Sequence, residues 1–487
     1  MPRLNILKAM TGIRWGAHPT NLLNVYKGFI RPLLDWGCQS FNPLDEILYL
    51  KISRLQYAAL KAVSGLMTTT PTNVLLDING EFPLDARWQG LTLRFLAKVM
   101  ARRSHPLRRL IKDLCDLPVA ERDNICLLTD TFFAHTELFG QTDTFHLPGY
   151  LEFPYECRHL DLAINTDLGH RVAADIDPAS SFERLTSSLK YDASFYTDGS
   201  RSELDNRAGF AVFSPELDLE HKERINNNCT IFEAEAFVIQ NAIDIVLEGK
   251  TRRAVIFSDS LSVLSSLDNP VSTGITHHGI LKIRSLLSEC FKQALIVHLF
   301  WIPSHRGIPG NERADILAKE SLRLPDTFLL SKCHYTNLYS KFKAISKGRA
   351  SQIILIESLH KRKRYFNDVR DVLAPPWYND KNIRENLTRP IVTFISRLRS
   401  YHTTAKGHFF YKNISDSAEC SCGHLFQDMN HIFFHCPNLH DDSNLLITQL
   451  HSIAFDITLD IPTLAFSNNT RIFRLLHGLA MRKDLII

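Results

Sequence analysis

The most informative segment of the chain is WIPSHRGIPGNERADILAKE, residues 301–320. It joins the end of an apolar strand to a loop rich in proline and glycine, and then begins a helix that turns Asp315 toward its inner face. Taken alone, an acid in the first turns of a helix is explained by the helix dipole, which favours negative charge there. Because soluble helices usually turn apolar residues inward, Asp315 indicates a polar site if acidic partners lie elsewhere in the chain.

The composition is that of a globular protein with room for several domains. The chain has 487 residues, of which 45% are hydrophobic, enough for sizeable cores. No apolar run approaches the roughly 18–20 residues that a membrane span needs, and the start, MPRLNILKAM, lacks the apolar region of a signal peptide. Ten cysteines show no disulfide-rich spacing. We therefore expect an intracellular protein, in the cytoplasm, the nucleus or both, with no membrane partner.

Apolar periodicity divides the chain into six regions. Residues 1–110 repeat apolar positions at helical spacing, whereas 111–190 are less regular and are interpreted as a connector. Within 191–325, strand-like and helix-like runs alternate, which is typical of a mixed α/β sheet. The remaining regions are a basic segment expected to be helical, a Cys/His cluster and a helical tail, at 326–414, 415–440 and 441–487.

Three further acids lie at the margins of predicted elements. Asp198 interrupts the strand SFYTDGS, Glu235 lies on or beside the buried face of the helix IFEAEAFVIQNAI, and Asp259 ends the strand AVIFSDS. Each is ordinary alone, since aspartates begin turns and glutamate favours helices. Together with Asp315 they would repel one another, so such a cluster is stable mainly around divalent cations. Oxygen ligands favour Mg²⁺ or Mn²⁺ over zinc, and two such ions can promote phosphodiester hydrolysis.

The order YTDGS, FEAE, FSDS and WIPSHRGIPGNERAD resembles the type 1 ribonuclease H domain. The resemblance implies a five-stranded mixed sheet flanked by helices, and an endoribonuclease that hydrolyses the RNA strand of RNA–DNA hybrids. It implies that two Mg²⁺ or Mn²⁺ ions are held by the four carboxylates Asp198, Glu235, Asp259 and Asp315. His305 would assist proton transfer or product departure, and Ser304 and Asn311 would lie near the substrate.

The flanking segments are similar to the C-terminal part of a non-LTR (LINE, Jockey/I-like) retrotransposon reverse transcriptase polyprotein. Residues 1–110 resemble the helical thumb after the polymerase palm, and CSCGHLFQDMNHIFFHCP (420–437) resembles the Cys-Cys-His-Cys element near the C-terminus. The aromatic-Ala-Asp-Asp tetrapeptide of a palm does not occur in the sequence. We therefore expect a truncated polyprotein that keeps the nuclease, makes no DNA by itself and associates with other retrotransposon proteins.

The Cys/His cluster has the spacing of a small metal site. Cys420, Cys422, His431 and Cys436 offer three thiolates and an imidazole, which suit tetrahedral zinc, although one residue between the first two cysteines is tighter than usual. His424 and His435 are alternative ligands. The less favoured alternative is a set of free cysteines beside an incidental histidine.

Positive charge is concentrated between residues 327 and 412. This stretch holds 17 Lys/Arg against five acids, a local net charge of +12, whereas the whole chain carries +4. Aromatic residues are interleaved, and a nucleic-acid contact surface and a solvated basic face are equally consistent with the pattern. The leading hypothesis is a hybrid-cleaving nuclease, and the alternative is a catalytically silent nucleic-acid-binding remnant. The four carboxylates and His305 favour the first.

Overall fold

The computed structural model describes residues 2–483 and 485, apart from 13–14, 42–45, 103–104, 117, 119–125, 143–154, 271–276, 326–331, 362 and 370. The chain forms two compact units. Unit 1 comprises residues 1–92, 123–131 and 342–487, and unit 2 comprises 93–122 and 132–341. Among the described residues, no helix combines the length and the apolar character needed to cross a lipid bilayer.

Unit 2 is built on a six-stranded mixed sheet with the order β1-β6-β5-β2-β3-β4. Its strands are β1 (Ile164–Asn165), β2 (Ala193–Ser202), β3 (Arg207–Ser214), β4 (Leu219–Ile225), β5 (Arg253–Ser258) and β6 (Ile296–Trp301). Strands β1, β6, β5 and β2 run parallel, whereas β3 is antiparallel to both β2 and β4. The expected number of five strands was wrong. The extra strand, β1, has only two residues, too few for an alternating apolar pattern to reveal it.

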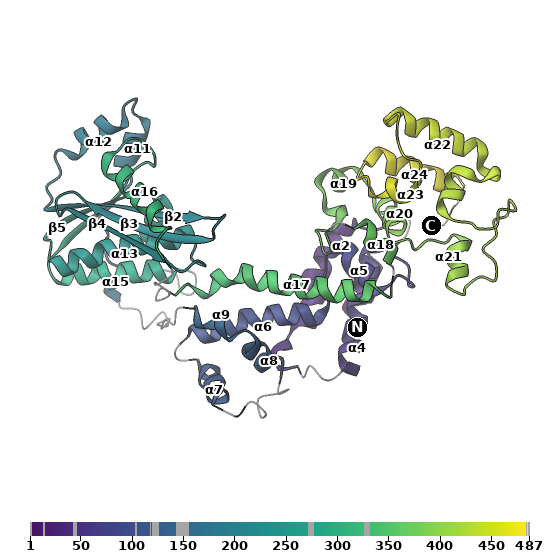
Figure 1. The fold of residues 1–487 in the computed structure, drawn as a ribbon, viewed down its shortest axis with the longest axis horizontal. Coiled ribbons are helices and arrows are strands. Elements are labelled where there is room, and N and C mark those ends of the chain that lie inside the picture. The colour runs from purple at the N-terminus through teal and green to yellow at the C-terminus, as the bar shows by residue number, and fades with distance from the viewer. Residues whose placement is uncertain are drawn as a thin grey trace. The chain divides into compact units, whose positions relative to one another are not determined.

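Helices cover both faces of this sheet (Figure 1). On one face lie α11 (Asp167–Ala174), α12 (Pro178–Thr186) and α16 (Pro309–Ser321), and on the other lie α13 (Ile231–Gly249) and α15 (His278–Lys292). Val255 and Phe257, two residues apart on β5, both point into the first layer, as strand periodicity requires. The mixed α/β architecture predicted for residues 191–325 is therefore confirmed.

Residues 111–190, interpreted as a connector, contain several short helices and a strand in their described part. Besides β1, α11 and α12, they include the end of α7 (Pro106–Cys115) and the helices α8 (Leu127–Ala134), α9 (Thr136–Gly140) and α10 (Tyr155–Arg158). Residues 117, 119–125 and 143–154 of this region lie outside the described part. The acidic turn Asp175–Asp177 precedes α12, where Asp177 accepts a hydrogen bond from the Ser180 backbone N–H. The acidic turn is a helix cap.

Unit 1 is helical, and both ends of the chain build its core. The first part contributes α1 (Pro2–Ala9), α2 (Pro19–Val25), α3 (Arg31–Asp35), α4 (Glu46–Ser64), α5 (Thr72–Ile78) and α6 (Leu84–Ala101, which continues into unit 2). The last part contributes α17 (Tyr339–Ser358), α18 (Lys363–Asp368), α19 (Lys381–Asn386), α20 (Arg389–Arg399), α21 (Lys406–Tyr411), α22 (His440–Ile453), α23 (Ile461–Phe466) and α24 (Thr470–Arg482). Tyr26, Phe433 and Phe473 are fully buried in the same cluster. The predicted helical character of the C-terminal region is confirmed.

Three arginines of the basic segment are buried structural residues of unit 1. Arg389 donates hydrogen bonds to the carbonyl oxygens of Ala62 and Val63 at 2.8 and 2.7 Å. Arg399 donates to the Ala465 carbonyl at 2.8 Å, and Arg397 donates to the Gly65 carbonyl at the same distance. The interpretation of the whole stretch as a solvated or phosphate-binding face was therefore wrong for these three, because helix termini and loops use them to satisfy buried carbonyls.

Candidate functional site

Three of the four predicted carboxylates meet at one edge of the sheet in unit 2. Residues Thr197 of β2 and Ser258 of β5 are paired in parallel register, so Asp198 and Asp259, which follow them, emerge side by side. Glu235 reaches the same place from α13. One carboxylate oxygen from each of these three acids lies within 4.8 Å of the others.

Close packing between β2 and α13 brings Glu235 to the site. A Cβ atom at Gly199 would lie 2.8 Å from the backbone nitrogen of Glu235, which is closer than the packing permits, so a glycine is required beside Asp198. The start of α13 is fixed by a capping box between Thr230 and Glu233, an arrangement that satisfies two backbone N–H groups. The motif YTDGS thus supplies both the acid and the space for its neighbour.

The three acids are strongly perturbed. Burial raises the pKa of Asp198 to about 8, and the charges of Asp259 and Asp315 add to this effect. Burial also raises the pKa of Glu235 well above its ordinary value, with further contributions from Asp259 and Asp198. Burial raises the pKa of Asp259 too, although a hydrogen bond from Ser304 opposes this shift. Desolvation and mutual repulsion therefore both disfavour the fully ionised cluster.

The cluster fits a bound cation. Glu235 Oε2 is buried and has no hydrogen-bond partner within the described part of the chain, and a buried carboxylate oxygen without a partner is costly. The predicted neighbour Asn311 is 2% exposed and lies beside Asp259. Three convergent carboxylates with an unsatisfied oxygen provide the ligand set that Mg²⁺ or Mn²⁺ prefers.

Asp315 and His305 belong to an adjoining group. Ligand atoms of His305, Glu312 and Asp315 lie within 4.8 Å of one another, and the Asp315 carboxylate accepts a hydrogen bond from Lys319 at 2.7 Å. The two groups adjoin, since the charge of Asp315 raises the pKa of Asp198. His305 is exposed on the loop before α16, with a left-handed backbone (φ 53°).

Glu312 and Lys319 were missed by the sequence analysis. Both lie on α16, three residues before and four residues after Asp315, and side chains at these spacings share one helix face. The helical periodicity around Asp315 could have identified them. Glu312 also accepts the Gly307 backbone N–H at 3.2 Å, which ties the His305 loop to the helix.

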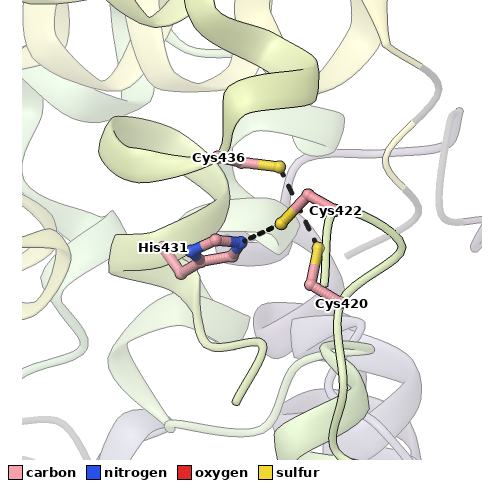
Figure 2. A group of neighbouring side chains, drawn as sticks. All are labelled: Cys420, Cys422, His431 and Cys436. Carbon is pink, nitrogen blue, oxygen red and sulfur yellow. Dashed lines mark hydrogen bonds between the residues drawn. The ribbon is translucent and has the colours of Figure 1, made fainter. Parts of the chain in front are cut away.

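The Cys/His cluster forms a separate group, which lies in unit 1. Ligand atoms of Cys420, Cys422, His431 and Cys436 all lie within 4.8 Å of one another. Figure 2 shows the two cysteines of the 420–422 loop facing His431 and Cys436. The sulfur atoms of Cys420 and Cys436 are 3.9 Å apart, and Cys422 Sγ lies 3.3 Å from His431 Nε2.

The alternative histidine ligands lie differently. His424 is stacked on the His431 ring, with centroids 4.2 Å apart, and its Nδ1 faces the backbone of Phe426. His435 is the last residue of the short π-helix His431–His435 and is exposed. The geometry favours His431 as the fourth member of the cluster.

Comparison with known protein families agrees with the geometry of unit 2. Residues 190–323 match the family model described as RNase H. The match contains all five predicted active-site residues, Asp198, Glu235, Asp259, His305 and Asp315. No curated protein matches the chain. The chain therefore contains an RNase H domain at residues 190–323, and this domain supports a nuclease that acts on nucleic acid.

The raised pKa of Asp198 predicts a stability that falls with pH when no metal is bound. Between about pH 4 and about pH 8, the folded state keeps a proton on Asp198 that the unfolded chain has released. Unfolding then releases this proton, so raising the pH favours unfolding. Asp198→Asn removes the ionisation. In metal-free buffer, the melting temperature of this variant should rise relative to that of the wild type as the pH increases from 5 to 8, roughly the interval bounded by the two pKa values.

Mg²⁺ should remove much of this difference by stabilising the wild type, because bound metal favours the ionised acid. Asp268→Asn, at an exposed position at the end of α14 (Leu261–Asp268), is the matched control and should follow the wild type. If the melting temperatures of the wild type and Asp198→Asn change in parallel with pH in metal-free buffer, the raised pKa of Asp198 is contradicted.

Proposed function

We propose that this protein is a metal-dependent endoribonuclease that hydrolyses the RNA strand of RNA–DNA hybrids. The observation that carries the proposal is the convergence of Asp198, Glu235 and Asp259 inside the segment that matches RNase H. An uncompensated cluster of buried acids would destabilise the fold, so its presence is best explained by the cations it would hold.

The active-site residues would have different roles in this reaction. Asp198, Glu235 and Asp259 would hold one ion, and Asp315 would take part in holding a second. Two Mg²⁺ or Mn²⁺ ions would supply an activated water and charge stabilisation at the scissile phosphate. His305, exposed on its loop, would carry a proton toward or away from the site or assist product departure. Lys319 would give up its contact with Asp315 when a cation takes its place.

The context we propose is the C-terminal part of a non-LTR retrotransposon polyprotein. The motifs of the helical N-terminal segment and of the Cys/His cluster support this placement, and so does the order in which they flank the RNase H domain. Here unit 1 would serve as a nucleic-acid-binding module of the same chain.

We also propose that the Cys/His cluster binds Zn²⁺. Ligand atoms of a tetrahedral zinc ion with bonds of about 2.0–2.3 Å lie roughly 3.3–3.8 Å from one another. The observed distances of 3.9 and 3.3 Å are close to this range. Gln427 Nε2 donates to Cys420 Sγ at 3.3 Å, as a partner outside the ligand set would. Four protein ligands leave no open position, so the proposed role is structural.

Phosphate contacts are proposed for the exposed basic residues only. Lys361 and Arg364 are exposed, and the Arg364 guanidinium lies 4.7 Å from the centre of the Tyr401 ring. Arg362, which lies between them in the sequence, is outside the described residues, and the side chain of Lys363 is not described either. Tyr401 is only partly exposed, and basic side chains beside aromatic rings are common in sites that contact single-stranded nucleic acid.

The purified full-length protein should cleave labelled RNA in an RNA–DNA hybrid with Mg²⁺ or Mn²⁺, and not after chelation. Asp198→Asn and Glu235→Gln should each reduce the rate by about a hundredfold or more, because charge stabilisation by bound metal is worth several kcal/mol and each ~1.4 kcal/mol is tenfold. His305→Ala should have a smaller effect.

Glu248→Gln, at an exposed position on the same helix as Glu235, is the control and should retain full activity. Wild-type protein that binds the hybrid in Mg²⁺ but leaves it intact would support the silent binding remnant instead. Undiminished cleavage by Asp198→Asn would exclude the proposed site.

For the Cys/His cluster, Co²⁺-loaded protein should show an intense sulfur-to-cobalt absorption band. Cys436→Ser should weaken this band and cost the protein one equivalent of tightly bound zinc, because a thiolate ligand is lost. Hydrogen exchange should increase in the 418–427 loop after zinc is removed, since metal binding contributes folding free energy. The control is Cys115→Ser, far from the cluster in sequence. A wild-type protein without the band would contradict the proposal.

Affinity for single-stranded RNA should fall with salt, and the double variant Lys361→Gln/Arg364→Gln should flatten the slope of log affinity against log salt. Each lost phosphate contact should change the slope by about 0.7. The control is Lys250→Gln, on the RNase H domain at the end of α13. It removes one positive charge, as each single substitution of the double variant does. An unchanged slope in the double variant would make these residues a solvated face.

A further inference from the structure

A small cavity in unit 1 is lined in part by residues 426–430, which lie between Cys422 and His431 of the Cys/His cluster. The other lining residues come from α18, α20 and the turn after it, α21 and α23, and all of those described belong to unit 1. The cavity has a volume of about 190 Å³, less than the roughly 300–1,000 Å³ of pockets that take drug-sized ligands. It therefore suits a group the size of a single ring system.

Aromatic rings that water can reach contribute to the lining. Tyr411 is 75% exposed, and Tyr401 and Phe426 are half-buried. The rings of Tyr411 and Phe426 are arranged edge to face, with centroids 5.6 Å apart. Leu398 and Ile461, each 2% exposed, add apolar surface to the lining. A flat ring that stacks on these side chains would remove apolar surface from water.

Close backbone packing holds two of these rings in place. The Gly407 backbone N–H of α21 donates to the Gln427 carbonyl at 3.0 Å, and a Cβ atom at Gly407 would lie 2.6 Å from the Phe426 ring. The Gln427 side chain also accepts the Lys406 backbone N–H at 2.9 Å. The start of α21, the helix that carries Tyr411, is thus fixed against the segment that carries Phe426. A cavity formed in advance loses less conformational freedom when a ligand enters it.

The lining includes an oriented hydrogen-bond acceptor. Asp428 is exposed, and its Oδ1 accepts the His431 backbone N–H at 2.8 Å, which orients the carboxylate. Asn430, by contrast, is engaged within the protein, because its side chain accepts the Ile461 backbone N–H and donates to Asp460, both at 2.8 Å. A carboxylate in the lining favours a ring that carries an N–H donor, such as the amino group of cytosine, adenine or guanine.

Positive charge lies at the same cavity. The exposed side chain of Arg364 belongs to the lining, and its guanidinium lies 4.7 Å from the centre of the Tyr401 ring. Lys361, three residues earlier, is exposed too. Because these two side chains are proposed to contact phosphates, a strand that they hold would have its bases within reach of the cavity. Ring faces beside cationic side chains favour a nucleobase over a protein side chain as the occupant.

We propose that this cavity takes one unpaired base of a single-stranded nucleic acid, and that it prefers a base with an amino group to uracil. The inference rests on the proposed binding of nucleic acid by unit 1. The base would stack on Tyr411 and Phe426, its amino group would donate to Asp428, and the adjacent phosphate would contact Arg364. Uracil, like thymine, presents a carbonyl oxygen where cytosine presents its amino group, and a carboxylate repels that oxygen.

The test uses the full-length protein and unlabelled DNA octamers built from tetrahydrofuran abasic units, with a central cytosine, a central uracil or no base. The three probes carry the same charge, so a difference in affinity reports the base alone. In isothermal titration calorimetry, the cytosine probe should bind about tenfold more tightly than the abasic probe, the usual order for a base stacked on an aromatic ring. The uracil probe should bind more weakly than the cytosine probe.

Two variants test the roles of the lining residues. Tyr411→Ala should remove most of the difference between the cytosine and abasic probes. The matched control is Phe410→Ala, the preceding residue of α21, which is 45% exposed and lies outside the lining, and it should keep the difference. Asp428→Asn retains an acceptor for the His431 backbone N–H and adds an amide donor. This variant should reverse the preference between cytosine and uracil, an effect that a loss of folding would not produce.

The phosphate contacts are tested separately with Lys361→Gln/Arg364→Gln, which should weaken binding of all three probes. Equal affinity of the wild type for the three probes would overturn the base pocket and leave the cavity for a protein side chain. The phosphate contacts would survive that result if the double variant still weakened binding. A base preference with no effect of the double variant would instead support the pocket and reject the phosphate contacts, and a wild type that binds no probe would overturn both.

Discussion

The removal of three neighbouring carboxylates from water is the physical constraint that the site in unit 2 must satisfy. Parallel pairing of β2 with β5 places Asp198 beside Asp259, and the close approach at Gly199 brings Glu235 against them. Burial disfavours the ionised form of each of these three acids, and the charge on one acid disfavours ionisation of its neighbours. This arrangement lowers the stability of the fold unless protons or a bound cation neutralise the acids. Selection for packing alone would place apolar residues at these three positions.

Sequence analysis located this site because acids interrupted periodic apolar patterns. Asp198 breaks a strand alternation, and Glu235 lies among the apolar residues of a helix; such interruptions are visible without a structure. Local patterns cannot, however, show which of four acids come closest. The structure groups Asp315 with His305 and Glu312, and the contact with Lys319 depends on helix geometry. Strand β1 was missed because it pairs with β6 through a long-range contact, and two residues are too few to form a recognisable strand pattern in the sequence.

The Cys/His cluster shows how a local motif depends on a distant core. Between His431 and Cys436, the chain buries Ile432, Phe433 and Phe434 in the core shared by both ends of unit 1. Two ligands are therefore positioned by apolar packing, whereas Cys420 and Cys422 lie on a loop held by a few backbone hydrogen bonds. A metal ion would join the loop to a part of the chain that is already ordered. The spacing of cysteines in the sequence contains no information about this asymmetry.

Burial also changes what the basic composition means for nucleic-acid binding. Three arginines of the basic segment donate hydrogen bonds to backbone carbonyl oxygens: Arg389, Arg397 and Arg399. Burial lowers the pKa of Arg399 to about 9. The Arg399 guanidinium also lies 4.1 Å from the centre of the Trp377 ring, so one of the aromatic residues interleaved in the basic segment packs against a buried arginine. Long-range attraction of a polyanion requires charges that face solvent. The electrostatic surface available to nucleic acid is therefore smaller than the count of basic residues indicates, and it depends on side chains such as Lys361 and Arg364.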